Sequence, residues 1–181
     1  MVHKKQVVRI DAGWPSEAAC LEDALRDNLD SLYRFALRLS QNTAEAQDLA
    51  QETAVRAWKQ QNAVQSWRAW LFQTLYHVFI SSRRHRHRWK EAEEGAWDEE
   101  LASSDPLPAV IATEDVRRAI EALPEELRAV VWLSDAEELR LREIAQILGW
   151  PIGTVASRLW RARSEMRKLL SAYVSPREKQ P

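Results

Sequence analysis

The sequence of 181 residues contains one cysteine, Cys20, and four glycines. A single thiol cannot form an intrachain disulfide or build a thiolate metal site, so both are excluded and a reducing compartment is expected. No apolar run is long enough to span a bilayer, and the first residues lack the continuous apolar core of a signal peptide. These absences predict a cytoplasmic protein without a membrane insertion.

Alternating apolar and polar runs are also scarce, whereas apolar residues recur at helical spacing, which predicts an all-α fold. Thr43 and Ser66 are expected to cap the second and third helices, Thr113 the fourth, and Pro124 to occupy the first position of the fifth. The first helix is expected to turn one apolar stripe inward. This stripe contains Leu21, Leu25, Leu29, Leu32, Phe35, Ala36 and Leu39.

The formal net charge of -1 hides an uneven distribution. Thr53 to Lys90 contains no acidic residue but many bases, and the next stretch, Glu91 to Asp105, contains acids and no bases. A basic face followed by an acidic segment favours a nucleic-acid partner. The bases are Arg56, Lys59, Arg68, Arg83, Arg84, Arg86, Arg88 and Lys90.

The acidic stretch lacks helical periodicity and continues into the turn-forming sequence SSDPLP, so it is interpreted as a flexible linker between two small helical domains. The expected divisions are an N-terminal extension (1–18), a first domain (19–90), the linker (91–112), a second domain (113–173) and a tail (174–181).

The segment LREIAQILGWPIGTVASRLWRAR carries the pattern of a helix-turn-helix. Ala145 is small where two helices must approach, Gly149 can adopt the left-handed conformation that ends a helix, and Pro151 prevents the first helix from continuing. In a helix-turn-helix the start of the second helix enters the major groove, which places Thr154 and neighbouring residues at base edges and phosphates. The simpler interpretation is an amphipathic hairpin with a solvated basic face. Agreement among all these features favours DNA contact.

Aromatic residues near the basic run of the first domain could stack on unpaired bases of single-stranded DNA. At helical spacing, however, residues such as Trp67, Trp70, Tyr76 and Phe79 are more often part of a core, and that interpretation is favoured for most of them. His85 and His87 do not share a helix face and lie among arginines, so they predict a solvated basic run rather than a metal site.

Taken together, these motifs resemble those of the extracytoplasmic-function (group 4, sigma-70 family) RNA polymerase sigma factors. LYRFALRLSQNTAEAQDLAQETAVRAW and SWRAWLFQTLYHVFISSRRHRHR are similar to the family's region 2, and ALPEELRAVVWL with LREIAQILGWPIGTVASRLWRAR is similar to region 4. The resemblance covers residues 19–173 and follows the family's order. It implies a promoter-specificity subunit without catalytic activity of its own or a cofactor.

The resemblance also implies three sets of site residues. Those expected to bind the β′ clamp helices of core polymerase are Asp48, Leu49, Gln51, Glu52, Arg56 and Trp58. Those expected to contact minus-ten DNA, as duplex and as melted strand, are Trp67, Arg68, His77, Ser81, Arg83 and Arg84. Those expected to contact the minus-thirty-five element are Thr154, Ser157, Arg158, Trp160 and Arg161. An anti-sigma factor that masks both DNA-binding domains is a further implied partner, and in this family such a factor is often tethered to the membrane, which would hold the chain at the inner membrane face.

Five positions depart from the family pattern. His77 and Ser81 stand where Asn and Asp are common, so base preference at minus ten does not follow from the resemblance. Gln47 replaces an acid ahead of the clamp-binding motif, and Ala156 replaces a base and cannot contact phosphate or guanine. Glu138 occupies a usual glycine position, which predicts a differently shaped turn before the helix-turn-helix.

Two other function classes remain open from the sequence. A stand-alone helix-turn-helix regulator would bind duplex DNA as a dimer, but it has no need for the segment DLAQETAVRAW. An enzyme is the least favoured class, because no nucleophile with a nearby base, phosphate-binding glycine loop or metal-ligand spacing is recognisable.

Overall fold

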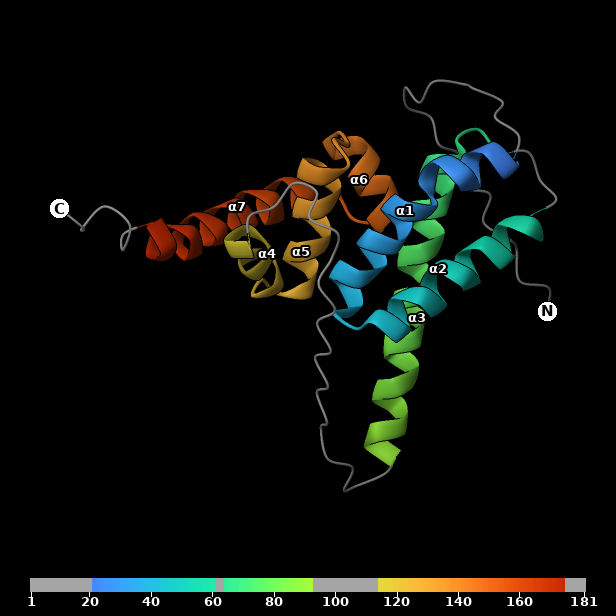
Figure 1. Cartoon of the computed structure of the whole chain (residues 1–181), viewed down its shortest axis with the longest axis horizontal. Coiled ribbons are helices and arrows are strands. Elements are labelled where there is room, and N and C mark those ends of the chain that lie inside the picture. The colour runs from blue at the N-terminus through green and yellow to red at the C-terminus, as the bar shows by residue number, and fades with distance from the viewer. Residues whose placement is uncertain (1–20, 61–63, 93–113, 175–181) are drawn as a thin grey trace.

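The computed structural model describes residues 21–60, 64–92 and 114–174, and within these ranges every regular element is helical. The first half contains α1 (Leu21–Ser40), α2 (Thr43–Trp58) and α3 (Trp67–Ala92). The second half contains α4 (Glu114–Glu121), α5 (Glu125–Val131), the π-helix η1 (Trp132–Ala136), α6 (Leu141–Leu148) and α7 (Ile152–Val174). The all-α prediction is therefore confirmed (Figure 1).

Helix caps explain where several of these elements begin. The Ser66 hydroxyl accepts a hydrogen bond from the Ala69 backbone N–H at 3.4 Å, as predicted for α3. The cap of α2 is Asn42 rather than Thr43, because the Asn42 side chain accepts from the Glu45 N–H at 3.0 Å. Pro124 precedes α5 instead of opening it, since its ψ of 143° is not helical and its carbonyl accepts from the N–H groups of Leu127 and Arg128. The predicted cap Thr113 lies outside the described residues.

The stripe predicted for α1 is largely buried, with one exception. Leu32, Phe35, Ala36 and Leu39 lie in the core, whereas Leu29 is 48% exposed. At about 100° per residue, Leu29 falls at the edge of the stripe, beside its exposed flank. The inward assignment of Leu29 was wrong.

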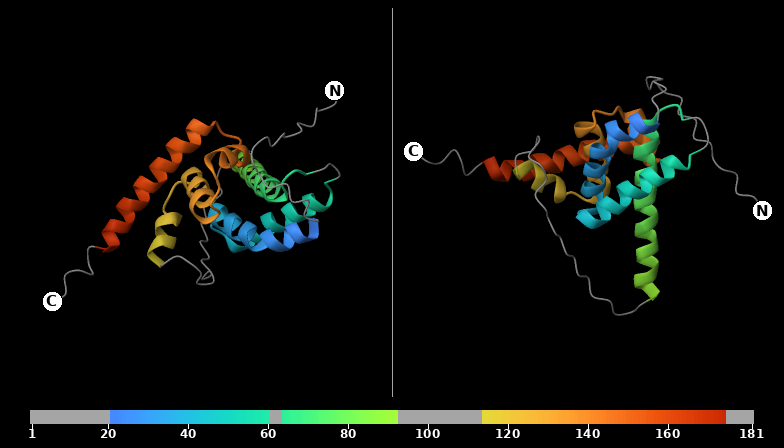
Figure 2. Two further views of the ribbon diagram at one scale, coloured as in Figure 1. Left: turned by 90° about the horizontal axis from the view of Figure 1, so that it is seen from above. Right: turned by 45° about the vertical axis from the view of Figure 1, so that its right-hand side comes forward.

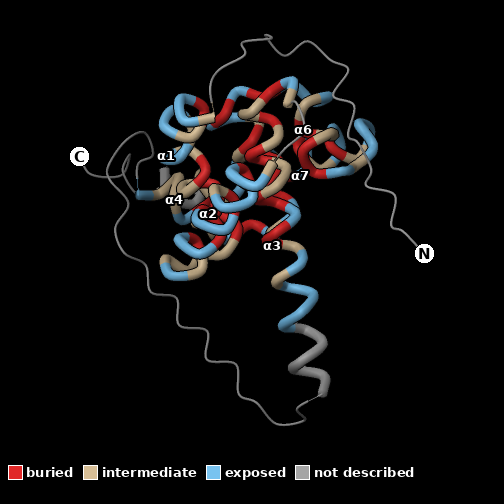
Figure 3. The backbone as a smooth tube through the Cα atoms, turned by 90° about the vertical axis from the view of Figure 1, so that its right-hand side faces the viewer, coloured by how far each residue is buried: buried red, intermediate tan, exposed pale blue. Residues whose placement is uncertain are grey.

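The two halves pack directly against each other. Their buried side chains form one continuous cluster, to which the first half contributes Phe35 and Phe72 and the second Leu133 and Ile144. Helix α1 contacts α5, and α3 contacts α6. Figure 2 shows α7 leading away from the first three helices, and in Figure 3 the buried residues lie among the packed helices of both halves. The predicted linker, extension and tail lie outside the described residues, apart from the ends of α3 and α7.

The helix-turn-helix forms as expected at α6 and α7. Gly149 has a φ of 69°, and the Trp150 N–H donates to the Ala145 carbonyl at 3.0 Å, which closes the end of α6. Pro151 directly precedes α7 and its carbonyl accepts from the N–H groups of Thr154 and Val155. Glu138, in the preceding turn, has a φ of 55°, so a non-glycine residue occupies a left-handed conformation there.

Candidate nucleic-acid and polymerase interfaces

The exposed side of α7 carries the residues predicted to contact the minus-thirty-five element. Ser157 and Arg161 are exposed, Trp160 is 70% exposed and Thr154 is half-buried. The Ser157 hydroxyl donates to the Thr154 carbonyl at 3.0 Å, one turn back along the helix. The start of α7 therefore presents polar, aromatic and cationic groups on one open face.

Arg158 belongs to the same predicted set but is held against its own half. One guanidinium nitrogen lies 2.6 Å from a Glu126 carboxylate oxygen, and the guanidinium carbon lies 4.0 Å from the centroid of the Trp150 ring. A guanidinium over an indole face is an attractive cation–π arrangement. Arg158 must leave Glu126 before it can make a bidentate contact with a base.

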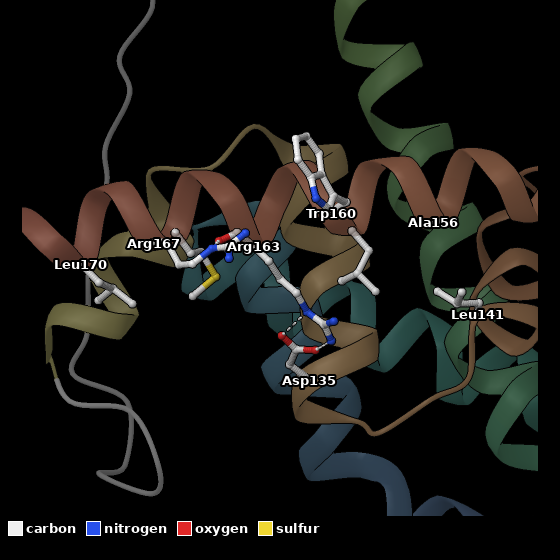
Figure 4. Close-up of a pocket in the computed structure, with 9 residues that line it drawn as sticks. Asp135, Leu141, Ala156, Trp160, Arg163, Arg167 and Leu170 are labelled. Atoms are coloured by element: carbon white, nitrogen blue, oxygen red, sulfur yellow. Dashed lines mark hydrogen bonds and ion pairs between the residues drawn. The ribbon is translucent and has the colours of Figure 1, made fainter.

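A groove of about 480 Å³ lies along α7, on the side where η1 and the start of α6 face it (Figure 4). Leu159, Trp160, Met166 and Leu170 supply much of its apolar surface. At its rim, Arg163 forms an ion pair with Asp135 at 2.5 Å. Sequence reasoning did not identify this groove, because it depends on the position of η1 beside α7. Its lining is Asp135, Leu141, Ala156, Leu159, Trp160, Arg163, Met166, Arg167 and Leu170.

Helix α2 displays most of the residues predicted to bind core polymerase. Asp48, Gln51 and Glu52 are exposed, as are Arg56 and Trp58. Glu52 and Arg56 form the i,i+4 ion pair expected from their spacing, at 2.7 Å.

Leu49, from the same predicted set, is buried in the core between the helices. In this structure it positions α2 and presents no surface to a partner. The exposed set consequently forms a charged face with one large aromatic side chain, Trp58, which is 61% exposed.

The minus-ten set is distributed along α3. Trp67 packs edge-on against Trp70 with ring centroids 5.8 Å apart, and both are half-buried, while Tyr76 and Phe79 are buried as favoured from the sequence. Arg68, at the start of the helix, donates to the Glu137 carboxylate at 2.9 Å and to the Glu137 carbonyl at 3.0 Å.

His77, Ser81, Arg83 and Arg84 follow on α3 and are exposed. Partial burial, together with the nearby positive charge of Arg56, lowers the pKa of His77 below its ordinary value. This shift favours the neutral form of the imidazole. Arg83 forms an ion pair with Glu125 and lies over the Phe79 ring at 6.0 Å.

The acidic partners of Arg68 and Arg83 come from the second half of the chain, and so does Glu121, which pairs with buried Arg38 at 2.9 Å. Burial lowers the pKa of Arg38, and Glu121 opposes that shift. These acids were not among the predicted functional residues. Ion pairs between distant segments depend on tertiary packing, which the spacing of residues in the sequence does not reveal.

The geometry defines a helical DNA-binding protein with a basic first half and a helix-turn-helix in the second. In the described ranges, no three His, Cys, Asp or Glu side chains gather where they could hold a metal ion. No helix there is both long and apolar enough to cross a membrane.

Comparison with known proteins identifies the family. Residues 24–89 match sigma-70 region 2, and residues 113–166 match sigma-70 region 4. The chain is 36% identical over 157 residues to the ECF RNA polymerase sigma factor EcfG of Rhodopseudomonas palustris, covering 83% of this chain and 87% of that protein. It is 35% identical over 162 residues to the ECF sigma factor SigE of Mycolicibacterium smegmatis, covering 85% of this chain and 63% of that longer protein.

A solved structure supports the same assignment. The sigma factor RpoE of Bartonella quintana, crystallised in complex with the anti-sigma factor NepR, is 31% identical with a TM-score of 0.71, and the match covers 83% of this chain and 96% of that one. The chain belongs to the ECF sigma-70 family of RNA polymerase sigma factors. Members of this family are non-enzymatic subunits that direct RNA polymerase to promoters.

Proposed function

We propose that this chain divides its contacts as region 2 and region 4 do in the resemblance described above. The exposed face of α2, with Asp48, Gln51, Glu52, Arg56 and Trp58, binds the β′ clamp helices of core polymerase, and Leu49 holds that face in place. One observation supports this most directly. The region 2 match contains an α2 face that is exposed, and the region 4 match of the same chain contains a helix-turn-helix face that is exposed.

DNA contacts are assigned to α3 and α7. Trp67, Arg68, His77, Ser81, Arg83 and Arg84 are proposed for the minus-ten element. Thr154, Ser157, Arg158, Trp160 and Arg161 are proposed for the minus-thirty-five element. The corresponding division is a region 2 domain at 19–90, a linker at 91–112 and a region 4 domain at 113–173, acting in the cytoplasm.

Run-off transcription tests this proposal. Purified core RNA polymerase is combined with a pool of bacterial promoter fragments, with and without the chain. We expect initiation at defined start sites only when the chain is present, which also yields the promoter motif. Duplex binding by the chain, with neither initiation nor binding to core polymerase, would support the stand-alone regulator instead.

An anti-sigma factor is a proposed partner, supported by the complex in which the Bartonella quintana relative was solved. The apolar groove along α7 suits an amphipathic helix of such a partner, because Trp160 and Leu170 offer apolar contact between charged rims.

A protein recovered with the tagged chain from its own bacterium should, once purified, suppress run-off transcription as its concentration rises. The Trp160→Ala variant should need more of it for the same suppression. Suppression that is unchanged in this variant would exclude the groove as the docking site.

A further inference from the structure

The start of α7 is exposed but carries no charge. Residues 151–157 have the sequence PIGTVAS, which contains neither an acid nor a basic residue. Ile152 is 47% exposed, Ala156 is exposed one turn later, and Trp160 is 70% exposed after one further turn. Residues four apart lie on the same side of a helix, so these three side chains form a single row, which we call the apolar row.

Two arginines lie near the apolar row but outside it. Arg158 is held against its own half, with its guanidinium 2.6 Å from Glu126 and over the ring of Trp150. Arg161 is exposed on the neighbouring side of the helix. A cation is therefore available beside the apolar row, whereas the row itself offers no charge to a base or a phosphate.

Gly153 and Ala156 keep this part of α7 narrow. Both are exposed, and a Cβ built on Gly153 would meet no heavy atom within 4 Å. Packing within the described residues therefore does not require a glycine at this position. Small residues let a helix backbone come close to a ligand, and a recognition helix must approach base edges closely in the major groove.

The chemistry of the major groove matches an apolar row to one base. Thymine presents an apolar group there, its C5-methyl, and small apolar side chains contact it. Guanine, adenine and cytosine present hydrogen-bond donors and acceptors, which the side chains of alanine and isoleucine cannot pair. Covering such groups without a partner costs free energy, so the apolar row favours thymine over the other bases.

Helix and DNA dimensions set the spacing of these contacts. Residues four apart in an α-helix are separated by about 6 Å along its axis. Successive bases of a DNA strand are separated by about 3.4 Å along the duplex. Ile152 and Ala156 can therefore reach bases roughly two steps apart when the start of α7 lies along the groove.

We propose that Ile152 and Ala156 contact the C5-methyl groups of two thymines in the minus-thirty-five element. Thymine is thereby selected at the position where a basic residue at 156, common in the family, would select guanine. This inference rests on the proposed contact of α7 with the minus-thirty-five element, and it names the base that two residues of that helix recognise.

Selection of duplex DNA by the full chain tests this assignment. The tagged chain is mixed with DNA duplexes of random sequence, and the enriched sequence is determined. Each thymine of the enriched duplex is then replaced singly by uracil, which removes only the methyl group, and fluorescence anisotropy measures binding. We expect binding to weaken about fourfold at two thymines, the effect of one buried methyl group, and to stay unchanged at the others.

Substitutions on α7 assign each thymine to a side chain. Ala156→Lys should change the enriched base at one of the two positions from thymine to guanine, because lysine can donate to O6 and N7 of guanine. Ile152→Ser should abolish the effect of uracil at the other position. Ser171→Lys adds the same charge at the exposed far end of α7 and is the matched control. It should tighten binding generally and leave the enriched sequence unchanged.

Three results would overturn the proposal. They are an enriched duplex in which no uracil weakens binding, the same enriched sequence for Ala156→Lys and the parent, and the absence of any enriched sequence. None of these measurements uses polymerase. Uracil-sensitive thymines without initiation in run-off transcription would support the base assignment and remove the sigma function, whereas initiation without such thymines would do the reverse.

Discussion

The sides of α3 and α7 that we propose to contact DNA carry similar residue types but differ in what surrounds them. On α3, Arg68 and Arg83 are paired with acids from the other half of the chain. On α7, Arg161 is exposed, and Arg158 is paired with Glu126 of its own half. One arrangement of the halves therefore affects the two surfaces unequally: it pairs two of the α3 arginines with acids across the interface, but neither Arg158 nor Arg161.

The largest effect is expected from a substitution that removes core packing at α3. Phe72 is fully buried and its ring centroid lies 5.6 Å from that of Phe35. Phe72→Ala should lower the free energy of unfolding by about 3–5 kcal/mol, since it leaves a cavity in a close-packed core. Chemical denaturation followed by circular dichroism measures this loss. Because the core is continuous, we expect one transition at lower denaturant; two separated transitions would mean that the halves unfold independently.

The next effect concerns the open face of α7. Arg161→Ala should weaken the free energy of promoter recognition by about 1–3 kcal/mol, the range for a lost bidentate base contact. Promoter-specific transcription should fall accordingly, and polymerase binding should stay unchanged. Run-off transcription and a polymerase pull-down measure the two activities. Arg118→Ala removes an exposed arginine from α4 and serves as the matched control. Loss of polymerase binding in Arg161→Ala would contradict the separation of roles.

The converse change is made on α2. Asp48→Ala combined with Glu52→Ala should weaken binding to core polymerase about tenfold, near 1.4 kcal/mol, because two charges are lost from the proposed clamp-binding face. Duplex binding through α7 should remain. Fluorescence anisotropy with core polymerase measures the change, and Glu22→Ala combined with Asp23→Ala on α1 provides a control of equal charge. An equal loss in the control would show that net charge, rather than this face, determines binding.

The smallest effect is expected at the turn before the helix-turn-helix. Glu138 has a φ of 55°, a conformation that costs a non-glycine residue about 1 kcal/mol or more. Glu138→Gly should raise the stability of the second half by up to about 1 kcal/mol, because part of the relief is offset by the greater freedom of the unfolded chain. Thermal unfolding measures this change in stability. Gln41→Gly provides the comparison. It relieves the same left-handed conformation, a φ of 54°, but it also removes the hydrogen bond from the Gln41 side chain to the Glu121 carbonyl across the interface.

Much of the fold followed from local patterns in the sequence. The apolar spacing located the helices, Ser66 was identified as a cap, and Gly149 with Pro151 marked the turn between α6 and α7. Glu138 was identified as unusual because glycine is common there in the family. These features depend on residues within one or two helical turns of each other, which is why the sequence predicts them.

Contacts between the halves could not be predicted in the same way. Buried Arg38, its pairing with Glu121 and the groove beside Asp135 depend on which helices meet in space. Leu49 illustrates the limit within one helix: the family pattern included it with Asp48 and Glu52, but helical geometry turns it into the core. Periodicity indicates which side is apolar, and only packing decides what covers that side.

The continuous core has a consequence for synthesis. Tyr76 packs against Trp150, which leaves the ribosome much later, and at roughly 5–20 residues per second several seconds separate the two. During that interval the nascent first half has α3 uncovered where α6 will dock. Chaperone binding and proteolysis during translation should therefore concentrate on this side of α3, and a pause before the region 4 segment would prolong its exposure.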